Sequence, residues 1–258
     1  MFHRVSRWRL IIIVSVLGAL AAWGVAMYVV APRPTPEIRG YALAEELGCH
    51  GCHGPRGTGG IPNPRSDEAE IPSWDGGTAM MYVKDEGEIR EWILDGMPRR
   101  LEQEHAGHDH GGARLPVRMP AFRSVLDENE IEDLVAYYKV VAAWDEIPER
   151  ARRGYTVASE RGCFGCHGPR GLIGARNRKS LKGYIPPWRG SDFSELVKND
   201  DELRSWIQDG NLPRFERNPL AQFFTHRQVI QMPAYRDVID ESELVDLVAY
   251  IQWLQQRE

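Results

Sequence analysis

The chain has 258 residues, a formal net charge of −5 and a charged fraction of 27%. This length suggests about two domains, and outside the N-terminus the composition is ordinary for a soluble globular protein. No basic patch of the kind that binds nucleic acid is present, which argues against that class of partner.

The first expected element is a membrane-spanning helix. Residues 10–31 carry no charge, and at about 1.5 Å per residue this stretch can span the ~30 Å core of a bilayer. Arg4, Arg7 and Arg9 precede it, which predicts a cytoplasmic N-terminus. A cleaved signal peptide is the alternative, but its apolar region is usually shorter and Pro32 would hinder cleavage. We therefore predict an uncleaved single-pass anchor over residues 1–31 in the inner membrane, with the remainder in the periplasm.

A repeat organises the rest of the chain. Residues 32–36 contain three prolines and predict a stiff, extended spacer. Residues 37–145 and 154–258 then resemble each other, with a linker at 146–153; for example, Gly40-Tyr41 matches Gly154-Tyr155. We therefore predict two domains of the same fold.

Each repeat is predicted to be helical. A first helix is expected at about 37–47 and a middle one at about 86–94, where Asp95-Gly96 signals its end. The last helix of each repeat begins with a sequence typical of a capping box, at 127–130 and 240–243, followed by apolar residues at helical spacing.

After the first helix of each repeat comes a Cys-x-x-Cys-His string, at 49–53 and at 163–167. This is the attachment signature of a c-type haem, whose vinyl groups form thioether bonds with the two thiols. A single such string could instead be half a zinc site or a redox-active dithiol. Because Gly-Pro-Arg-Gly follows both strings, we predict two haem c groups, held by four cysteines that leave none for a disulfide: Cys49, Cys52, Cys163 and Cys166.

Each repeat resembles a class I cytochrome c domain, and the pair is similar to the di-haem cytochrome subunits of bacterial haem–copper oxidases. The resemblance rests on the haem strings, tryptophan-containing segments, Met-Pro-Ala-aromatic strings at 119–122 and 232–235, and Leu-Val-Ala-Tyr at 134–137 and 247–250. It implies an all-α fold, with an N-terminal transmembrane helix followed by two tandem cytochrome c domains. It also implies that the first and last helices of each domain cross, with two glycine–tyrosine pairs at the crossings: Gly40 with Tyr137, and Gly154 with Tyr250.

The resemblance assigns His53 and His167 as proximal iron ligands and predicts a methionine as the second axial ligand of each haem. The first repeat offers several methionines. Only Met119 has a methionine counterpart in the second repeat, Met232, and both lie in the same four-residue string. A lone methionine is more often core filler, but this repetition favours Met119 and Met232 as the distal ligands.

Some residues near these motifs have less certain roles. His105, His108 and His110 have no counterpart in the second repeat. They could bind zinc or copper, supply a histidine that competes with Met119, or form a solvated loop. His50 stands where the second repeat has Phe164, and we expect it to face solvent at the haem edge. Four residues are candidates for hydrogen bonds to haem propionates: Arg56, Arg170, Trp74 and Trp188.

Two six-coordinate haems suit electron transfer, because no iron site is left open for a substrate. We therefore predict no catalytic residues and no enzymatic activity. The expected role is a carrier or subunit of a respiratory or photosynthetic electron-transport complex. Its expected partners are a membrane-embedded quinol-oxidising complex or terminal oxidase, a soluble redox protein, or both. A di-haem peroxidase, which must open one coordination site, is the alternative; a haem-based gas sensor, which would bind carbon monoxide, is a third hypothesis.

Overall fold

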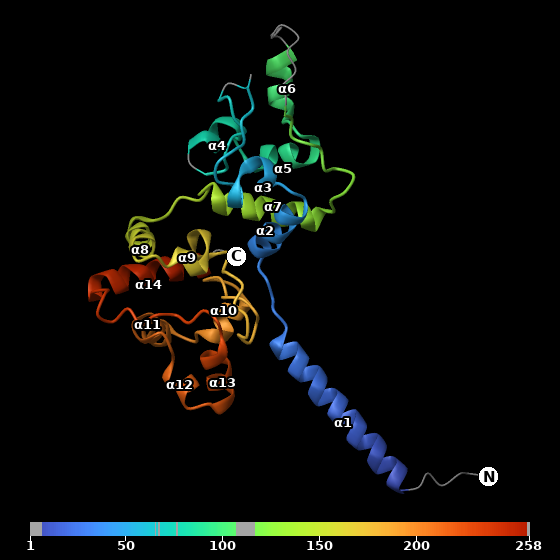
Figure 1. The fold of residues 1–258 in the computed structure, drawn as a ribbon, viewed down its shortest axis with the longest axis vertical. Coiled ribbons are helices and arrows are strands. Elements are labelled where there is room, and N and C mark those ends of the chain that lie inside the picture. Colours follow the sequence, from blue (N-terminus) through green and yellow to red (C-terminus); the bar gives the residue numbers. More distant parts are fainter. Residues whose placement is uncertain (1–6, 65, 67, 76, 107–116, 257–258) are drawn as a thin grey trace, which may run out of the picture.

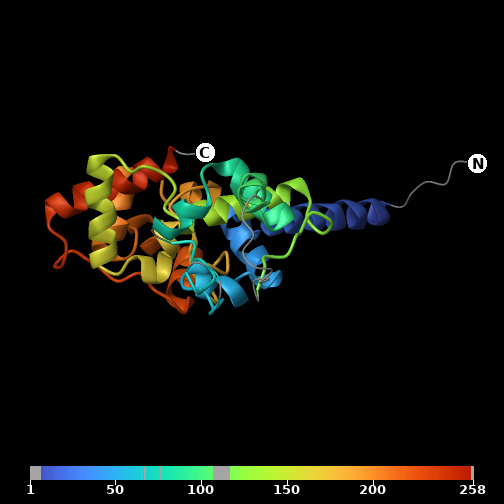
Figure 2. The ribbon, with the colours of Figure 1, turned by 90° about the horizontal axis from the view of Figure 1, so that it is seen from above.

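The chain folds into helices. The computed structural model describes residues 7–64, 66, 68–75, 77–106 and 117–256, and within these ranges it contains no strand. One long helix, α1 (Arg7–Val30), extends away from two helical units that follow each other along the chain (Figures 1 and 2). The predicted all-α class, with an apolar N-terminal helix and two repeated units, is confirmed.

The helix α1 exposes its apolar side chains from Trp8 to Tyr28. From Trp8 to Tyr28 it has a mean hydropathy of 2.5 and is not buried against the rest of the chain. Exposure of this much apolar surface to water is unfavourable. Its length and composition suit a membrane anchor, and they also suit a signal sequence.

The two units contain nearly the same succession of helices. The first consists of α2 (Pro36–Glu46), α3 (His50–His53), η1 (Pro55–Gly57), α4 (Gly77–Tyr82), α5 (Glu86–Asp95), α6 (Arg99–Ala106) and α7 (Glu128–Val141). The second consists of α8 (Glu149–Glu160), α9 (Phe164–His167), η2 (Pro169–Gly171), α10 (Ser191–Leu196), α11 (Asp200–Asp209), α12 (Pro213–Glu216), α13 (Pro219–Arg227) and α14 (Glu241–Gln255).

The first and last helices of each unit cross in close contact. A Cβ atom added to Gly40 in α2 would lie 1.8 Å from the carbonyl oxygen of Asp133 in α7 and 2.9 Å from Cβ of Tyr137. At the α8–α14 crossing, a Cβ on Gly154 would lie 2.0 Å from the carbonyl oxygen of Asp246. Only glycine allows this approach, and the glycine–tyrosine crossing that the resemblance implied is present in both units.

Local signals set most helix ends as expected. Asp127 and Asp240 each cap the last helix of their unit in a complete capping box. Helices α5 and α11 end at Gly96 and Gly210, which have left-handed φ values of 79° and 71°. The short helices α4, α6, α10, α12 and α13 were not expected, because none is long enough to show clear apolar periodicity.

The second unit contacts the chain segment that joins α1 to α2. The backbone N–H of Arg33 donates to the Asp192 carboxylate at 2.9 Å, and the Arg33 guanidinium pairs with Glu195 at 2.7 Å. The ammonium of Lys182 donates to the carbonyl of Ala31 at 3.1 Å. These contacts tie the second unit to the end of α1.

Candidate functional site

A cavity of about 160 Å³ opens in the first unit and has mainly apolar walls. Three residues of the first Cys-x-x-Cys-His string, Cys49, Cys52 and His53, line it, and so does Met119, which lies 66 positions after His53 in the sequence. The structure therefore brings the predicted attachment cysteines, proximal histidine and distal methionine to one cavity. The other walls come from α4, α5 and α7, including Tyr82, Trp92, Ile93, Leu134 and Tyr138.

A single helical turn positions the two thiols and the histidine. Gly48 adopts a φ of 75° after α2, and the N–H of Cys49 then donates to the carbonyl of Ala44 at 2.9 Å. The His53 N–H donates to the Cys49 carbonyl at 3.0 Å. Residues three and four apart on a helix share one face, so the turn presents Cys49, Cys52 and His53 together. None of the four cysteines forms a disulfide, and burial raises the pKa of the Cys49 and Cys163 thiols.

The histidines are prepared as metal ligands. Nδ1 of His53 lies 3.0 Å from the carbonyl of Pro72, to which it donates, so Nε2 remains available for a metal. Burial lowers the pKa of His53, and it lowers that of His167 to about 4, so both rings are neutral at pH 7. Nδ1 of His167 is buried without a well-formed hydrogen bond, although the Pro186 carbonyl is close enough to raise the pKa of this ring. Neutral imidazole is the metal-binding form, so these residues fit a haem iron.

Tryptophans cover these histidines. The ring centroid of Trp74 lies 4.9 Å from that of His53, and Trp188 lies equally far from His167. A Cβ added to Gly57 or Gly171 would lie 2.3 or 2.2 Å from the adjacent tryptophan ring, so glycine is required there. Of the propionate candidates, Trp74 lines the cavity, Trp188 and Arg170 are buried, and Arg56 is exposed.

The loop that carries the predicted distal methionine is fastened to the middle helix in both units. Backbone N–H groups of Phe122 and Arg123 donate to the last carbonyls of α5 at 3.1 and 3.2 Å, and residues 235 and 236 do the same on α11 at 3.1 Å each. A Cβ added to Gly96 would lie 2.4 Å from the Met119 carbonyl, and Gly210 has the same relation to Met232. Each methionine is partly buried and packs against the core.

Two buried asparagines, which sequence reasoning missed, hold the same loops. Asn63 and Asn177 are each 3% exposed. The amide of Asn63 donates to the carbonyl of Val117 and accepts from its N–H, both at 3.2 Å. The amide of Asn177 makes the same pair of bonds with Ile230, both at 2.9 Å. Val117 and Ile230 each lie two residues before a predicted methionine ligand. The repeat itself held the signal, because both copies have asparagine at this position.

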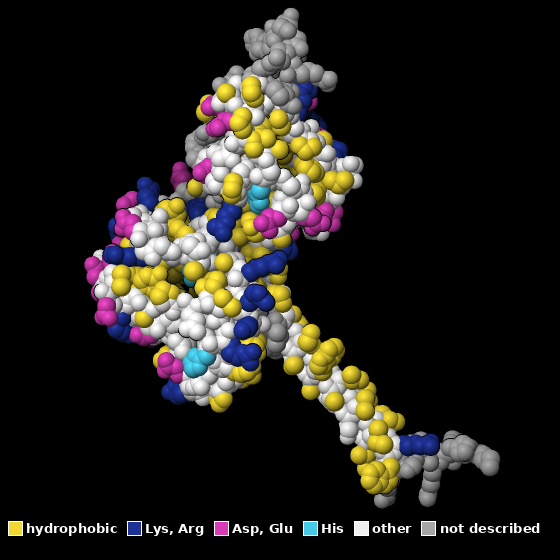
Figure 3. Space-filling model, in the orientation of Figure 1, with side chains coloured by type: hydrophobic (Ala, Val, Ile, Leu, Met, Phe, Trp, Pro, Cys, Tyr) yellow, Lys and Arg dark blue, Asp and Glu magenta, His cyan; other side chains and the backbone are white. Residues whose placement is uncertain are grey.

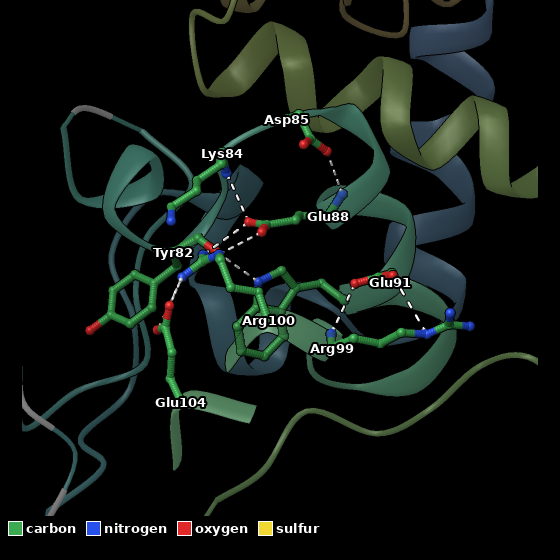
Figure 4. Close-up of polar contacts among 9 residues, drawn as sticks. Tyr82, Lys84, Asp85, Glu88, Glu91, Arg99, Arg100 and Glu104 are labelled. Carbon is green, nitrogen blue, oxygen red and sulfur yellow. Dashed lines mark hydrogen bonds and ion pairs between the residues drawn. The ribbon is translucent and has the colours of Figure 1, made fainter. Parts of the chain in front are cut away.

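A polar cluster supports the outer side of the cavity wall (Figure 4). The Glu88 carboxylate accepts from the guanidinium of Arg100 at 2.6 and 3.0 Å and from the N–H of Lys84 at 2.9 Å. These bonds hold the pKa of Glu88 below its usual value. The indole N–H of Trp92 donates to the carbonyl of Tyr82 at 3.2 Å, which joins two residues of the cavity wall.

His50 is less exposed than expected. Its Nε2 lies 3.0 Å from the hydroxyl of Tyr137, and its ring contacts Tyr41 and Trp74, so the side chain is partly buried. Tyr137 comes from α7, 87 residues away in sequence. This contact could not be recognised from the sequence around His50.

The histidine segment of the first repeat stays untested. His108 and His110 lie outside the described residues, as does the side chain of His105. Within the described part of the chain, no group of three or more His, Cys, Asp or Glu residues could hold a metal ion.

Comparison with known proteins matches both units to one family. The family model for cytochrome c matches residues 38–141 and again residues 151–255. No curated protein and no solved structure matches the chain. The two matches together span most of the sequence that follows α1.

Proposed function

The chain belongs to the cytochrome c family, with two tandem domains, and on that premise we propose that it is a membrane-anchored electron carrier with two His/Met-ligated haem c groups. Cytochrome c domains serve haem-based electron transfer. The observation that best supports the proposal is the single cavity that Cys49, Cys52, His53 and Met119 line together. When bound, haem iron supplies the one-electron exchange between its ferric and ferrous states.

The residues of the chain would hold the haem and set its reduction potential. The cysteine thiols fix it covalently, and the Pro72 carbonyl orients His53 through Nδ1. The methionine thioether raises the reduction potential relative to a second histidine. The mainly apolar walls would limit the access of water to the iron, which also raises the reduction potential. In the second domain the same roles fall to Cys163, Cys166, His167 and Met232.

The proposed location depends on α1, and the proposed partners depend on the shared motifs. As an uncleaved anchor (residues 1–31) with a cytoplasmic N-terminus, it places both haem domains on the periplasmic face of the inner membrane. The segment 32–36 is the spacer, 37–145 and 154–258 are the haem domains, and 146–153 links them. Electrons then pass between a quinol-oxidising complex and a terminal oxidase or soluble redox protein. The motifs shared with di-haem subunits of haem–copper oxidases favour a bound subunit.

Three experiments test this proposal. The intact mass of the chain from its native membranes should exceed that of the polypeptide by two haems and should retain residues 1–31. The variant C49A/C52A should lose one haem and keep the other. One haem, or bound zinc, in the native chain would contradict the cofactor assignment. Purification in a mild detergent should yield an oxidase or quinol-oxidising complex with the chain, and isolation of the chain alone would contradict the subunit role.

A further inference from the structure

The second domain has a surface that combines exposed apolar and basic side chains. We call it the α13 face and define it by seven exposed residues of α13 and the nearby loops: Leu220, Phe223, Val229, Arg176, Arg178, Lys179 and Arg227. Leu220 is 67% exposed, Phe223 50% and Val229 65%. Among the described residues, none of the four cations forms an ion pair with an acidic side chain. The surface is therefore without a partner in the chain as described.

Helical spacing and one loop contact make this surface continuous. Leu220, Phe223 and Arg227 are separated by three and four positions, so they lie along one side of α13. The guanidinium carbon of Arg227 lies 4.7 Å from the centre of the Phe223 ring. The N–H of Val229 donates to the carbonyl of Arg178 at 3.0 Å, which joins the basic loop to the end of α13.

The α13 face lies on the side of the molecule from which α1 extends. Lys182, three residues after Lys179, donates to the carbonyl of Ala31, the first residue after α1. Figure 1 shows α12 and α13 in the lower half of the view, where α1 also lies, and α6 at the opposite end. Figure 3 shows Lys and Arg side chains along the edge of the second unit that is next to α1. The basic loop therefore begins where α1 would leave a bilayer.

The first domain lacks the cations of the basic loop. At the repeat offset of 114, Pro62 and Pro64 stand where the second domain has Arg176 and Arg178. The basic loop thus occurs in the copy that is tied to the end of α1. A structural requirement common to the two domains would not produce this difference.

We propose that the α13 face rests on the surface of the membrane that α1 spans, with Leu220 and Phe223 at the headgroup–acyl boundary and the cations on lipid phosphates. This inference depends on the proposed function, because α1 must be a membrane anchor. Interfacial helices bury an apolar face at the headgroup–acyl boundary and keep Lys and Arg outside that face, and anionic headgroups attract such cations. The anchor keeps the face close to the lipid, so a weak surface affinity is sufficient.

Membrane contact would fix the orientation of the second domain, because lipid would hold it at two places, the anchor and α13. A redox protein is a less favoured occupant of this face, since the bond from Lys182 to Ala31 holds the neighbouring loop at the end of α1. The same contact would leave the first domain, which lies farther from α1 in Figure 1, accessible to such a protein.

The test is photolabelling of the full-length haem-loaded chain in lipid nanodiscs. The discs contain phosphatidylcholine and phosphatidylglycerol with a trace of phospholipid that carries a diazirine high on its acyl chain. Peptide mapping should find label in residues 10–31 and in residues 218–227. L220S/F223S should lower the second labelling several-fold and leave the first unchanged. The matched control M80S/M81S, which alters two exposed apolar residues of the first domain, should change neither.

The outcomes separate the two proposals. Label in α1 with none in 218–227 would overturn the membrane contact and leave the anchor intact, whereas absence of label in 10–31 would contradict the anchor itself. Discs of phosphatidylcholine alone should reduce the label in 218–227, and an equal yield in both lipids would contradict binding of the cations to anionic headgroups. Labelling that disappears in native membranes, where a co-purifying protein cross-links to α13 instead, would also overturn the proposal.

Discussion

Replacement of Asn177 by alanine should release the loop that carries Met232. Its amide makes two 2.9 Å hydrogen bonds to the backbone of Ile230, and the residue is 3% exposed. Alanine leaves a donor and an acceptor of Ile230 without partners, at about 1–3 kcal/mol for each buried group. Because Ile230 itself is only partly buried, water can satisfy part of this need. We expect a net cost of about 2 kcal/mol, which raises the population of the detached loop roughly thirtyfold.

Imidazole competition measures that population directly. Exogenous imidazole binds ferric haem only when the methionine has left, so its affinity for the second haem should rise by roughly thirtyfold. The methionine charge-transfer band of that haem should disappear at correspondingly lower imidazole concentration. The first haem is an internal control in the same chain, and N63A should reverse the pattern. Q231A is a matched control, because Gln231 is exposed and lies in the same loop.

One result would refute this reasoning. If N177A lowered the melting temperature but left the imidazole affinity of the second haem unchanged, the asparagine would stabilise the fold without positioning the methionine. An equal change at both haems would also contradict a local role.

Three further predictions concern helix packing, the pH dependence of stability, and His50, which stands where the second haem string has Phe164. G154A places a Cβ 2.0 Å from the Asp246 carbonyl oxygen, so α8 and α14 must separate. The free energy of unfolding of the second domain, measured by circular dichroism, should fall by about 3 kcal/mol. A loss of less than about 1 kcal/mol would contradict the crossing geometry. E88Q should lower the free energy of unfolding at pH 7. The pKa of Glu88 is held below its usual 4.5, so the stability that the ionised carboxylate contributes is present above that value and is lost as pH falls through the lowered pKa. Denaturant curves of E88Q and wild type should therefore converge in acid, and a constant difference would argue against the Arg100 pairing. H50F, which copies Phe164, should keep both haems and change stability by no more than about 1 kcal/mol, whereas loss of the first haem would give His50 an essential role.

Features set by a few neighbouring residues could be predicted from the sequence. The capping boxes at Asp127 and Asp240 and the glycine ends of α5 and α11 depend on residues within one helical turn. The two Cys-x-x-Cys-His strings are equally local. Comparison of the repeats then indicated Met119 without knowledge of the fold, and this residue does line the cavity with His53.

Features set by distant contacts could not be predicted in this way. The environment of His50 depends on Tyr137 from the last helix of the domain. The role of Asn63 depends on Val117, 54 residues later. In each case the residue is visible in the sequence, but its hydrogen-bond partner comes close only when the domain folds.

A redox titration of the purified full-length chain tests the central claim most directly. Two His/Met-ligated haems predict the uptake of two electrons per chain, a methionine charge-transfer band from both ferric haems, and no binding of carbon monoxide after reduction. A ferric haem without that band, which binds carbon monoxide once reduced and consumes hydrogen peroxide, would contradict the electron-carrier account and indicate a peroxidase.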